Sequence, residues 1–300
     1  MSNFSNLKRT SSLDALKKQV EKLTQSTEST SREDDRFWNP SVDKAGNGMA
    51  IVRFLPAPAV DGDDGTAFVQ VFSHGFQGAG GWLIDDCLTT IGQKCPVCEY
   101  NSKLWNSGIE TDKEIVRKQK RKLHYIANVY IVSDPSNPEN EGQVKLFKFG
   151  KKIFDKLNEA MSPEFPDEEP MNPFDFWSGA NFKLKMRKVD GYRNYDKSEF
   201  ESPSALFDGD DDQLEKLWKK EYSLKDFTNP ENFKSYDQIK QRLDKVIGVS
   251  GSVAERVSTN SRKQDSDDDY VPPAPTQKKQ ASVSTEEDED LDYFKSLAED

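Results

Sequence analysis

Short apolar runs bounded by turn residues predict the strands of this chain. The turn signal Gly46-Asn47-Gly48 precedes the first run, and Asp134-Pro135 ends the third. Other segments, between and after the strands, have the sequence pattern of helices. The predicted strands are 49–55, 66–72, 123–132, 143–149 and 181–187, and the predicted helices are 97–105, 111–122, 150–161, 211–220 and 235–247. The pattern predicts a mainly β protein with helices, in the α+β class.

Two of these strands combine apolar and basic residues in a regular alternation. In NFKLKMR, the period of two puts the apolar residues on one face and Lys183 and Lys185 on the other. In QVKLFKF, Lys145, Phe147 and Phe149 share a face. We therefore expect aromatic and basic side chains to share a surface of the sheet.

The two ends of the chain differ from this body. Leu13, Leu16, Val20 and Leu23 recur at helical spacing within the segment 1–25, which predicts one short amphipathic helix. A lone apolar stripe of this length needs a surface on which to dock, and a neighbouring molecule can supply it. A polar linker, QSTESTSREDDR, follows the helix.

The net charge of −11 over 300 residues is concentrated in the C-terminal tail. The segment 265–300 holds twelve acidic and three basic side chains, a net charge of −9, which leaves −2 for the segment 1–264. A tail of like charges is expected to be disordered and to bind partners. No apolar run reaches the length of a membrane span, and no secretory signal opens the chain, so we expect a soluble intracellular protein.

All three cysteines and one histidine lie close together in the sequence, in the order His74, Cys87, Cys95, Cys98. A Cys-Pro-Val-Cys turn can direct two sulfurs at one ion, and a third thiolate with one imidazole completes a tetrahedral Cys3His set typical of structural zinc. A disulfide would leave one thiol over, and unligated buried cysteines are the remaining alternative. His124, in an apolar strand, is expected to be an ordinary half-buried side chain.

Basic side chains interleaved with aromatic rings on short strands favour binding of single-stranded nucleic acid. Cations follow the phosphates, and rings stack on bases that a duplex would hide. The five-stranded OB barrel is a fold that often does this. The alternative is that the rings belong to the core and the charges are solvated.

Four segments, in order along the chain, resemble the single-stranded DNA-binding (helix-destabilising) proteins of T-even-like bacteriophages. They are KAGNGMAIVRFLP with the following H-x12-C and CPVC spacing, KRKLHYIANVYIVSDPSNPENEG, FGKKIFDKLN and WSGANFKLKMRKVDGYRNYDKSEF. The resemblance implies an OB-fold core over residues 26–254, with a zinc-binding subdomain inserted at 73–122. It also implies a basic cooperativity segment at 1–25 and a disordered acidic tail at 255–300.

Carried over by position, the resemblance names the residues of the site. It implies that one structural zinc ion is held by His74, Cys87, Cys95 and Cys98. The DNA-binding residues expected from the resemblance and from the basic runs are Trp105, Arg117, Lys120, Arg121, Lys122, Tyr125, Phe147, Lys183, Lys185, Tyr192 and Tyr195, the last two on a predicted loop. The residues expected to serve cooperativity are Lys8, Arg9, Thr10 and Ser11.

The sequence departs from the family pattern at two places. Leu123 and His124 stand where the family has hydroxyl residues after an internal basic element. The stretch between Cys87 and Cys95 is also shorter than in the family's best-known member and lacks its tyrosine.

The predicted function is a cooperative, sequence-non-specific coat for single-stranded DNA in phage replication, recombination and repair. The expected partners are single-stranded DNA, further copies of the chain along it, and replication and recombination proteins bound by the tail, in the cytoplasm of the infected host. No enzymatic activity is expected: a zinc deaminase would need Glu two residues after its His, where Phe76 stands. A zinc-containing adaptor would explain the tail but not the basic cleft.

Overall fold

The computed structural model describes residues 34–165, 167–189 and 191–248. The predicted N-terminal helix, the cooperativity residues and the acidic tail lie outside them. Contacts divide the chain into two units, Met1–Trp38 and Asn39–Asp300. In the first unit the structure describes a short turn, where Arg36 binds Asp34 at 2.7 Å. The described residues from Asn39 onward belong to the second unit.

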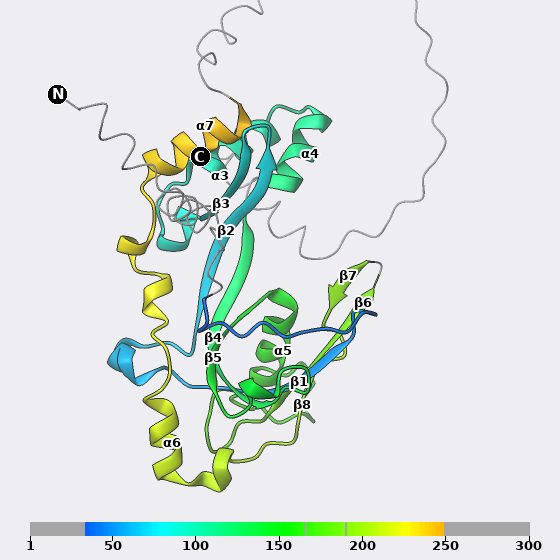
Figure 1. Ribbon diagram of the computed structural model, residues 1–300, viewed down its shortest axis with the longest axis vertical. Coiled ribbons are helices and arrows are strands. Elements are labelled where there is room, and N and C mark those ends of the chain that lie inside the picture. Colours follow the sequence, from blue (N-terminus) through cyan, green and yellow to red (C-terminus); the bar gives the residue numbers. More distant parts are fainter. Residues whose placement is uncertain (1–33, 166, 190, 249–300) are drawn as a thin grey trace, which may run out of the picture. The chain divides into compact units, whose positions relative to one another are not determined.

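The described residues of the second unit form one curled, antiparallel, eight-stranded sheet (Figure 1). Its order is β3-β2-β4-β1-β6-β7, with β5 paired to β4 and β8 paired to β6. The strands are β1 (Gly48–Phe54), β2 (Phe68–Gly78), β3 (Gly81–Asp86), β4 (Lys122–Ser133), β5 (Val144–Phe149), β6 (Phe182–Val189), β7 (Tyr192–Asn194) and β8 (Glu199–Phe200).

Strand β4 is the centre of this sheet because it pairs with three others. Its residues 122–127 pair with β2 and its residues 129–133 pair with β1. Residues 125–130 pair with β5, so β5 takes one edge of β4 while β2 and β1 share the other. The sheet curls into a half-barrel around β4, an arrangement consistent with an OB-like core (Figure 1).

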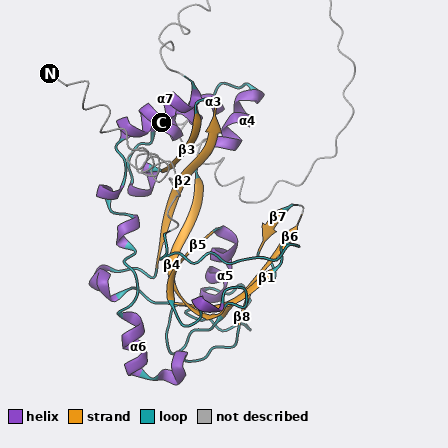
Figure 2. Ribbon diagram, in the orientation of Figure 1, coloured by secondary structure: helices purple, strands orange, loops and turns teal. Residues whose placement is uncertain are grey.

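Helices lie around this sheet (Figure 2). They are α3 (Pro96–Trp105), α4 (Glu110–Gln119), α5 (Lys151–Met161), α6 (Asp211–Trp218) and α7 (Tyr236–Ile247). The sequence explains the ends of α7: Ser235 and Gln238 form a capping box at its start, and Gly248 ends it in the left-handed conformation at φ 79°. All five predicted helices are confirmed, with ends shifted by a few residues.

Aromatic rings fill the core under β1, β5 and β6. The ring of Phe54 lies 5.6 Å from that of Phe149 and 5.8 Å from that of Phe182. The predicted alternation in β6 is confirmed, because Phe182, Leu184 and Met186 are buried while Lys183 and Lys185 reach the surface. Burial of this apolar face fixes the strand register.

A second apolar cluster surrounds the cysteines and includes residues far away in sequence. The hairpin β2–β3 contributes Phe76 and Leu83, and α7 contributes Ile239, Leu243 and Val246. The packing unit around the predicted zinc residues therefore contains α7 as well as residues 73–122. Glycines let the hairpin turn approach this helix, since a Cβ on Gly80 would lie 1.9 Å from the carbonyl oxygen of Lys245.

The hairpin itself was not expected. The predicted strand 66–72 continues in β2 as far as Gly78, and β3 returns beside it. Trp82 and Ile84 are 59% and 66% exposed on β3 while Leu83 between them is buried, so the apolar residues of this strand lie on both of its faces. The loop expected around Tyr192 is also a short strand, β7, paired with β6.

Candidate metal centre and nucleic-acid interface

Three elements, β2, the end of β3 and α3, bring the predicted metal ligands together. His74 lies on β2, and Cys87 directly follows β3. Cys95 is the N-cap of α3, and Pro96 occupies the first helical position, where its missing N–H costs nothing. The first turn of the helix then carries Cys98 back toward Cys95. All four side chains are buried.

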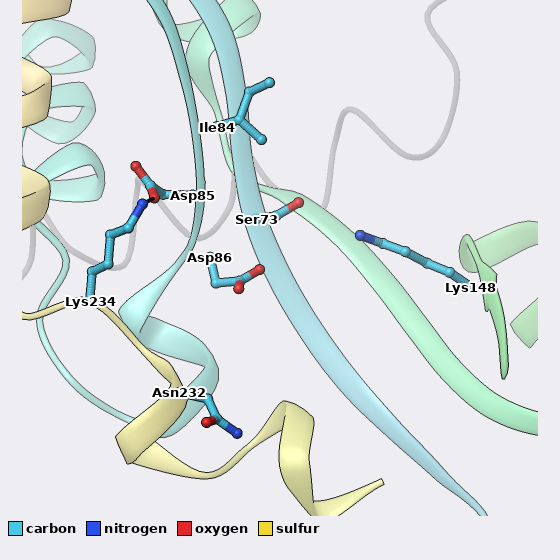
Figure 3. Close-up of a pocket in the computed structure, with 7 residues that line it drawn as sticks. All are labelled: Ser73, Ile84, Asp85, Asp86, Lys148, Asn232 and Lys234. Carbon is cyan, nitrogen blue, oxygen red and sulfur yellow. Dashed lines mark hydrogen bonds and ion pairs between the residues drawn. The ribbon is translucent and has the colours of Figure 1, made fainter. Parts of the chain in front are cut away.

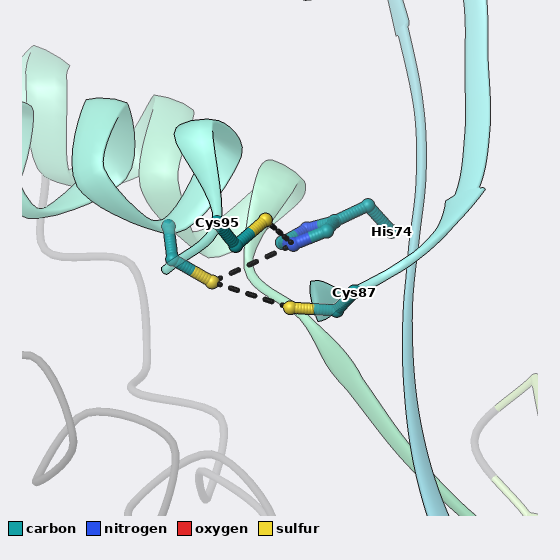
Figure 4. Close-up of side chains that lie close together, drawn as sticks. His74, Cys87 and Cys95 are labelled. Carbon is teal, nitrogen blue, oxygen red and sulfur yellow. Dashed lines mark hydrogen bonds between the residues drawn. The ribbon is translucent and has the colours of Figure 1, made fainter. Parts of the chain in front are cut away.

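The donor atoms are arranged as a tetrahedral ion requires. Figure 4 shows His74, Cys87 and Cys95 directed at one another. The Sγ atoms of Cys87 and Cys98 lie 3.5 Å apart, and His74 Nε2 lies 3.5 Å from Cys95 Sγ. Tetrahedral zinc with ordinary bond lengths needs S–S and S–N separations of roughly 3.5–3.8 Å. The buried His and Cys atoms all lie within 4.8 Å of one another, so the residues fit a metal ion of this kind.

Neighbouring groups orient two of the ligands. His74 Nδ1 lies 3.3 Å from the carbonyl oxygen of Gln119, which also accepts a 3.1 Å bond from the Asn101 side chain. A proton on Nδ1 leaves Nε2 free to coordinate, which is the usual arrangement for a metal-bound histidine. Thr89 Oγ1 lies 3.1 Å from Cys87 Sγ. Sequence reasoning missed Thr89, although a hydroxyl residue two positions after a cysteine ligand was a visible signal.

The protonation of the metal-free cluster opposes metal binding at low pH. Burial lowers the pKa of His74, but hydrogen bonds to Cys87 and Cys95 outweigh burial and raise it to about 9. Hydrogen bonds to Cys87 and Cys98 lower the pKa of Cys95. A metal must displace the remaining protons, so its affinity should fall as the pH falls. Burial lowers the pKa of His124 to about 4, and this side chain is half-buried as expected and lies outside the cluster.

Two of the predicted DNA-binding rings are buried rather than exposed. Tyr125 is 7% exposed and stacks on Phe154, with the ring centroids 4.0 Å apart. Phe147 is 2% exposed and packs against Phe149 at 5.4 Å. The expectation that Phe147 shares an open surface with Lys145 is therefore wrong for this structure. Stacking of Tyr125 or Phe147 on DNA stays a prediction.

The other three predicted rings reach the surface. Tyr192 is 80% exposed at the start of β7, and Tyr195 is half-buried just after that strand. Trp105, at the end of α3, is half-buried below two cations, with Lys113 Nζ 5.7 Å and the Arg117 guanidinium 5.9 Å from its ring. The exposed and half-buried rings predicted to bind DNA thus lie in two places: Trp105 beside Arg117, and the tyrosines on or next to the β6–β7 hairpin.

Several of the predicted cations already have acidic partners. Lys183 binds Glu201 at 3.0 Å, and Lys185 binds Glu199 at 2.6 Å. Arg117 binds Glu110 at 2.9 Å. The basic face of β6 is therefore partly neutralised by carboxylates on or just after β8, which the alternation within β6 alone did not reveal. Lys120 and Arg121 are half-buried between α4 and β4, and Lys122 is exposed at the start of β4.

A pocket of about 330 Å³ lies at the base of the β2–β3 hairpin. Figure 3 shows Asp86 and Lys148 directed toward one another from its opposite sides. Burial raises the pKa of Asp86 and lowers that of Lys148. Asp85, also at this pocket, pairs with Lys234 and with Arg242. Carboxylates and cations alternate here, so the pocket has no consistent charge with which to attract a phosphate.

Among the residues that the structure describes, no helix combines the length and the apolar character needed to cross a membrane.

Comparison with known proteins identifies the family. The model of the family described as gp32 DNA binding protein like matches residues 46–247. A single-stranded DNA-binding protein of Enterobacteria phage T2 is 37% identical over 251 residues, which cover 82% of this chain and 81% of that protein. One of Enterobacteria phage T4 is 39% identical over 241 residues, covering 78% and 77% respectively. The chain therefore belongs to the gp32-like DNA-binding family.

Proposed function

We propose that this chain binds single-stranded DNA cooperatively and without sequence preference, and that it coats DNA during phage replication, recombination and repair. The observation that carries the proposal is the family match over residues 46–247, together with relatives named as single-stranded DNA-binding proteins. Its site of action is the cytoplasm of the infected bacterium. The family is one of DNA-binding proteins, in agreement with the prediction that the chain is not an enzyme.

The proposal assigns separate roles to parts of the chain. Residues 26–254 form an OB-fold core that binds DNA, and the unit at 73–122 holds one structural zinc ion. Bound zinc would supply a fixed, closed cross-link among His74 and the three cysteines, without chemistry on the DNA. Residues 1–25 bind a neighbouring copy, and residues 255–300 recruit replication and recombination proteins.

The curled sheet and the metal cluster support these finer assignments. A curled sheet in which β4 pairs with three other strands is consistent with an OB-like core. Three thiolates with one imidazole favour zinc over harder ions such as magnesium or calcium. Phe76, at the position where a deaminase would carry its glutamate, is packed in the apolar cluster.

A binding titration tests the proposal. The metal-loaded full chain is titrated onto a long single strand and onto a duplex of the same sequence, with fluorescence anisotropy as the readout. We expect a strong preference for the single strand and a steep salt dependence. Equal affinity for both forms would contradict the proposed function. An adaptor without a DNA site would bind neither form at moderate salt.

A further inference from the structure

Thr89 lies between a predicted metal ligand and a predicted DNA-binding cation. Its Oγ1 atom is 3.1 Å from Cys87 Sγ on one side. On the other side, Arg121 Nη1 donates to the same oxygen at 2.8 Å. One hydroxyl group therefore connects the metal cluster with the start of β4.

The hydrogen-bonding capacity of a hydroxyl fixes the direction of these contacts. The Arg121 guanidinium has only donors, so Thr89 Oγ1 must accept from it. The single hydroxyl proton is then available for Cys87 Sγ, and a thiolate is the best acceptor for it. A metal-bound thiolate and a fixed guanidinium thus favour the same orientation of the hydroxyl.

A second contact holds the guanidinium in place. Its central carbon lies 4.0 Å from the ring centroid of Phe72, on β2. This is close enough for a favourable cation–π interaction. Thr90 holds the same turn against β2, since its Oγ1 accepts a 2.9 Å bond from the backbone N–H of Phe72 and donates to the carbonyl oxygen of the same residue. The Thr90 hydroxyl is thus engaged by backbone, whereas the Thr89 hydroxyl is engaged by two side chains.

We propose that Thr89 is a positioning residue that couples the metal centre to DNA binding through Arg121. The proposal rests on the proposed function, in which Arg121 contacts a DNA phosphate. With metal bound, the Cys87 sulfur orients the Thr89 hydroxyl, and the hydroxyl holds Arg121 against Phe72 at the surface that meets the DNA. Because such coupling is reciprocal, DNA bound at Arg121 also strengthens the binding of the metal.

Matched variants separate this role from a structural one. Thr89→Val removes the hydroxyl at nearly constant shape, and Thr89→Ser keeps it. Thr90→Val removes the neighbouring hydroxyl, which bonds to backbone. We expect Thr89→Val to weaken binding to an oligo(dT) strand roughly tenfold, near the lower end of the effect of one hydrogen bond to a charged group. Thr89→Ser should restore the affinity, and Thr90→Val should leave it near that of the wild type.

A double variant tests whether Thr89 acts through Arg121. In an Arg121→Gln background, Thr89→Val should cause no further loss of DNA affinity. An equal loss in both backgrounds would overturn the coupling.

The metal side has its own readouts. In the cobalt(II)-substituted protein, Thr89→Val should shift the sulfur-to-cobalt charge-transfer band, and Thr90→Val should not. In equilibrium competition with a chelator, saturating oligo(dT) should raise the cobalt affinity of the wild type severalfold, and should not raise that of Thr89→Val. If Thr89→Val and Thr90→Val behave alike in all these measurements while the wild type still prefers single strands, the coupling is wrong and the proposed function stands. If the wild type does not prefer single strands, the proposed function fails first.

Discussion

Substitution of one leucine on α7 tests whether this helix belongs to the unit that holds the metal ligands. Leu243 is 1% exposed in the apolar cluster that also contains the three cysteines. Leu243→Ala would leave a cavity between α7 and the β2–β3 hairpin. Gln241→Ala, at an exposed position of the same helix, is the matched control.

The magnitude follows from the burial of the side chain. Fully buried Leu→Ala changes cost about 2–5 kcal/mol, and a site between a helix and a hairpin can collapse partly, so we expect about 3 kcal/mol. If the unit around the metal opens separately from the rest of the sheet, its opening equilibrium should rise roughly a hundredfold. Added metal should recover part of the loss, because it binds only the closed form.

Amide hydrogen exchange measures this local opening. In Leu243→Ala, the backbone amides of the paired residues Phe76 and Leu83, in the hairpin, should exchange much faster than in the wild type. Exchange in the pairing of Ala50 with Leu184, between β1 and β6, should change little. Unchanged exchange in the hairpin, or an equal acceleration in both pairings, would refute the assignment of α7 to the metal unit.

Three further changes have defined outcomes. Burial raises the pKa of Glu221 from 4.5 to about 9, so the protein loses stability as the pH rises through this range. In urea unfolding, the free energy of unfolding of Glu221→Gln should therefore increase relative to that of the wild type by about 1.4 kcal/mol per pH unit. A difference that does not change with pH would argue against the raised pKa. Glu199→Gln should free Lys185 and strengthen single-strand binding about two- to fivefold at low salt; unchanged affinity would count against Lys185 as a DNA contact. Gly80→Ala should force the hairpin turn away from the Lys245 carbonyl and lower the melting temperature, whereas a neutral result would mean that this contact is easily relaxed.

The candidate metal site could be predicted from sequence because its signals are local. The Cys-Pro-Val-Cys turn fixes two ligands at the start of one helix, and the structure brings the other two predicted ligands, His74 and Cys87, to suitable distances. The contribution of α7 could not be predicted in the same way. Leu243 lies far along the chain from Cys98, and its amphipathic pattern says only that it packs on something.

Strand prediction succeeded where the apolar side chains of a strand share one buried face and failed where they lie on both faces. The alternation in β6 matches its burial, since its apolar side chains face the aromatic core. In β3, Trp82 and Ile84 face outward, so a prediction that assumes that apolar residues are buried fails for this strand. The ion pairs of Lys183 and Lys185 depend on β8, a separate and later segment that the pattern within β6 does not specify.

The central claim is cooperative binding of single-stranded DNA that depends on the N-terminal segment. The most direct measurement is a salt titration of binding to single-stranded and duplex DNA, with residues 1–25 present and removed. We predict a preference for the single strand in both proteins, with cooperativity lost in the shortened one and its intrinsic affinity retained. Equal affinity for duplex, or unchanged cooperativity after removal, would contradict the account.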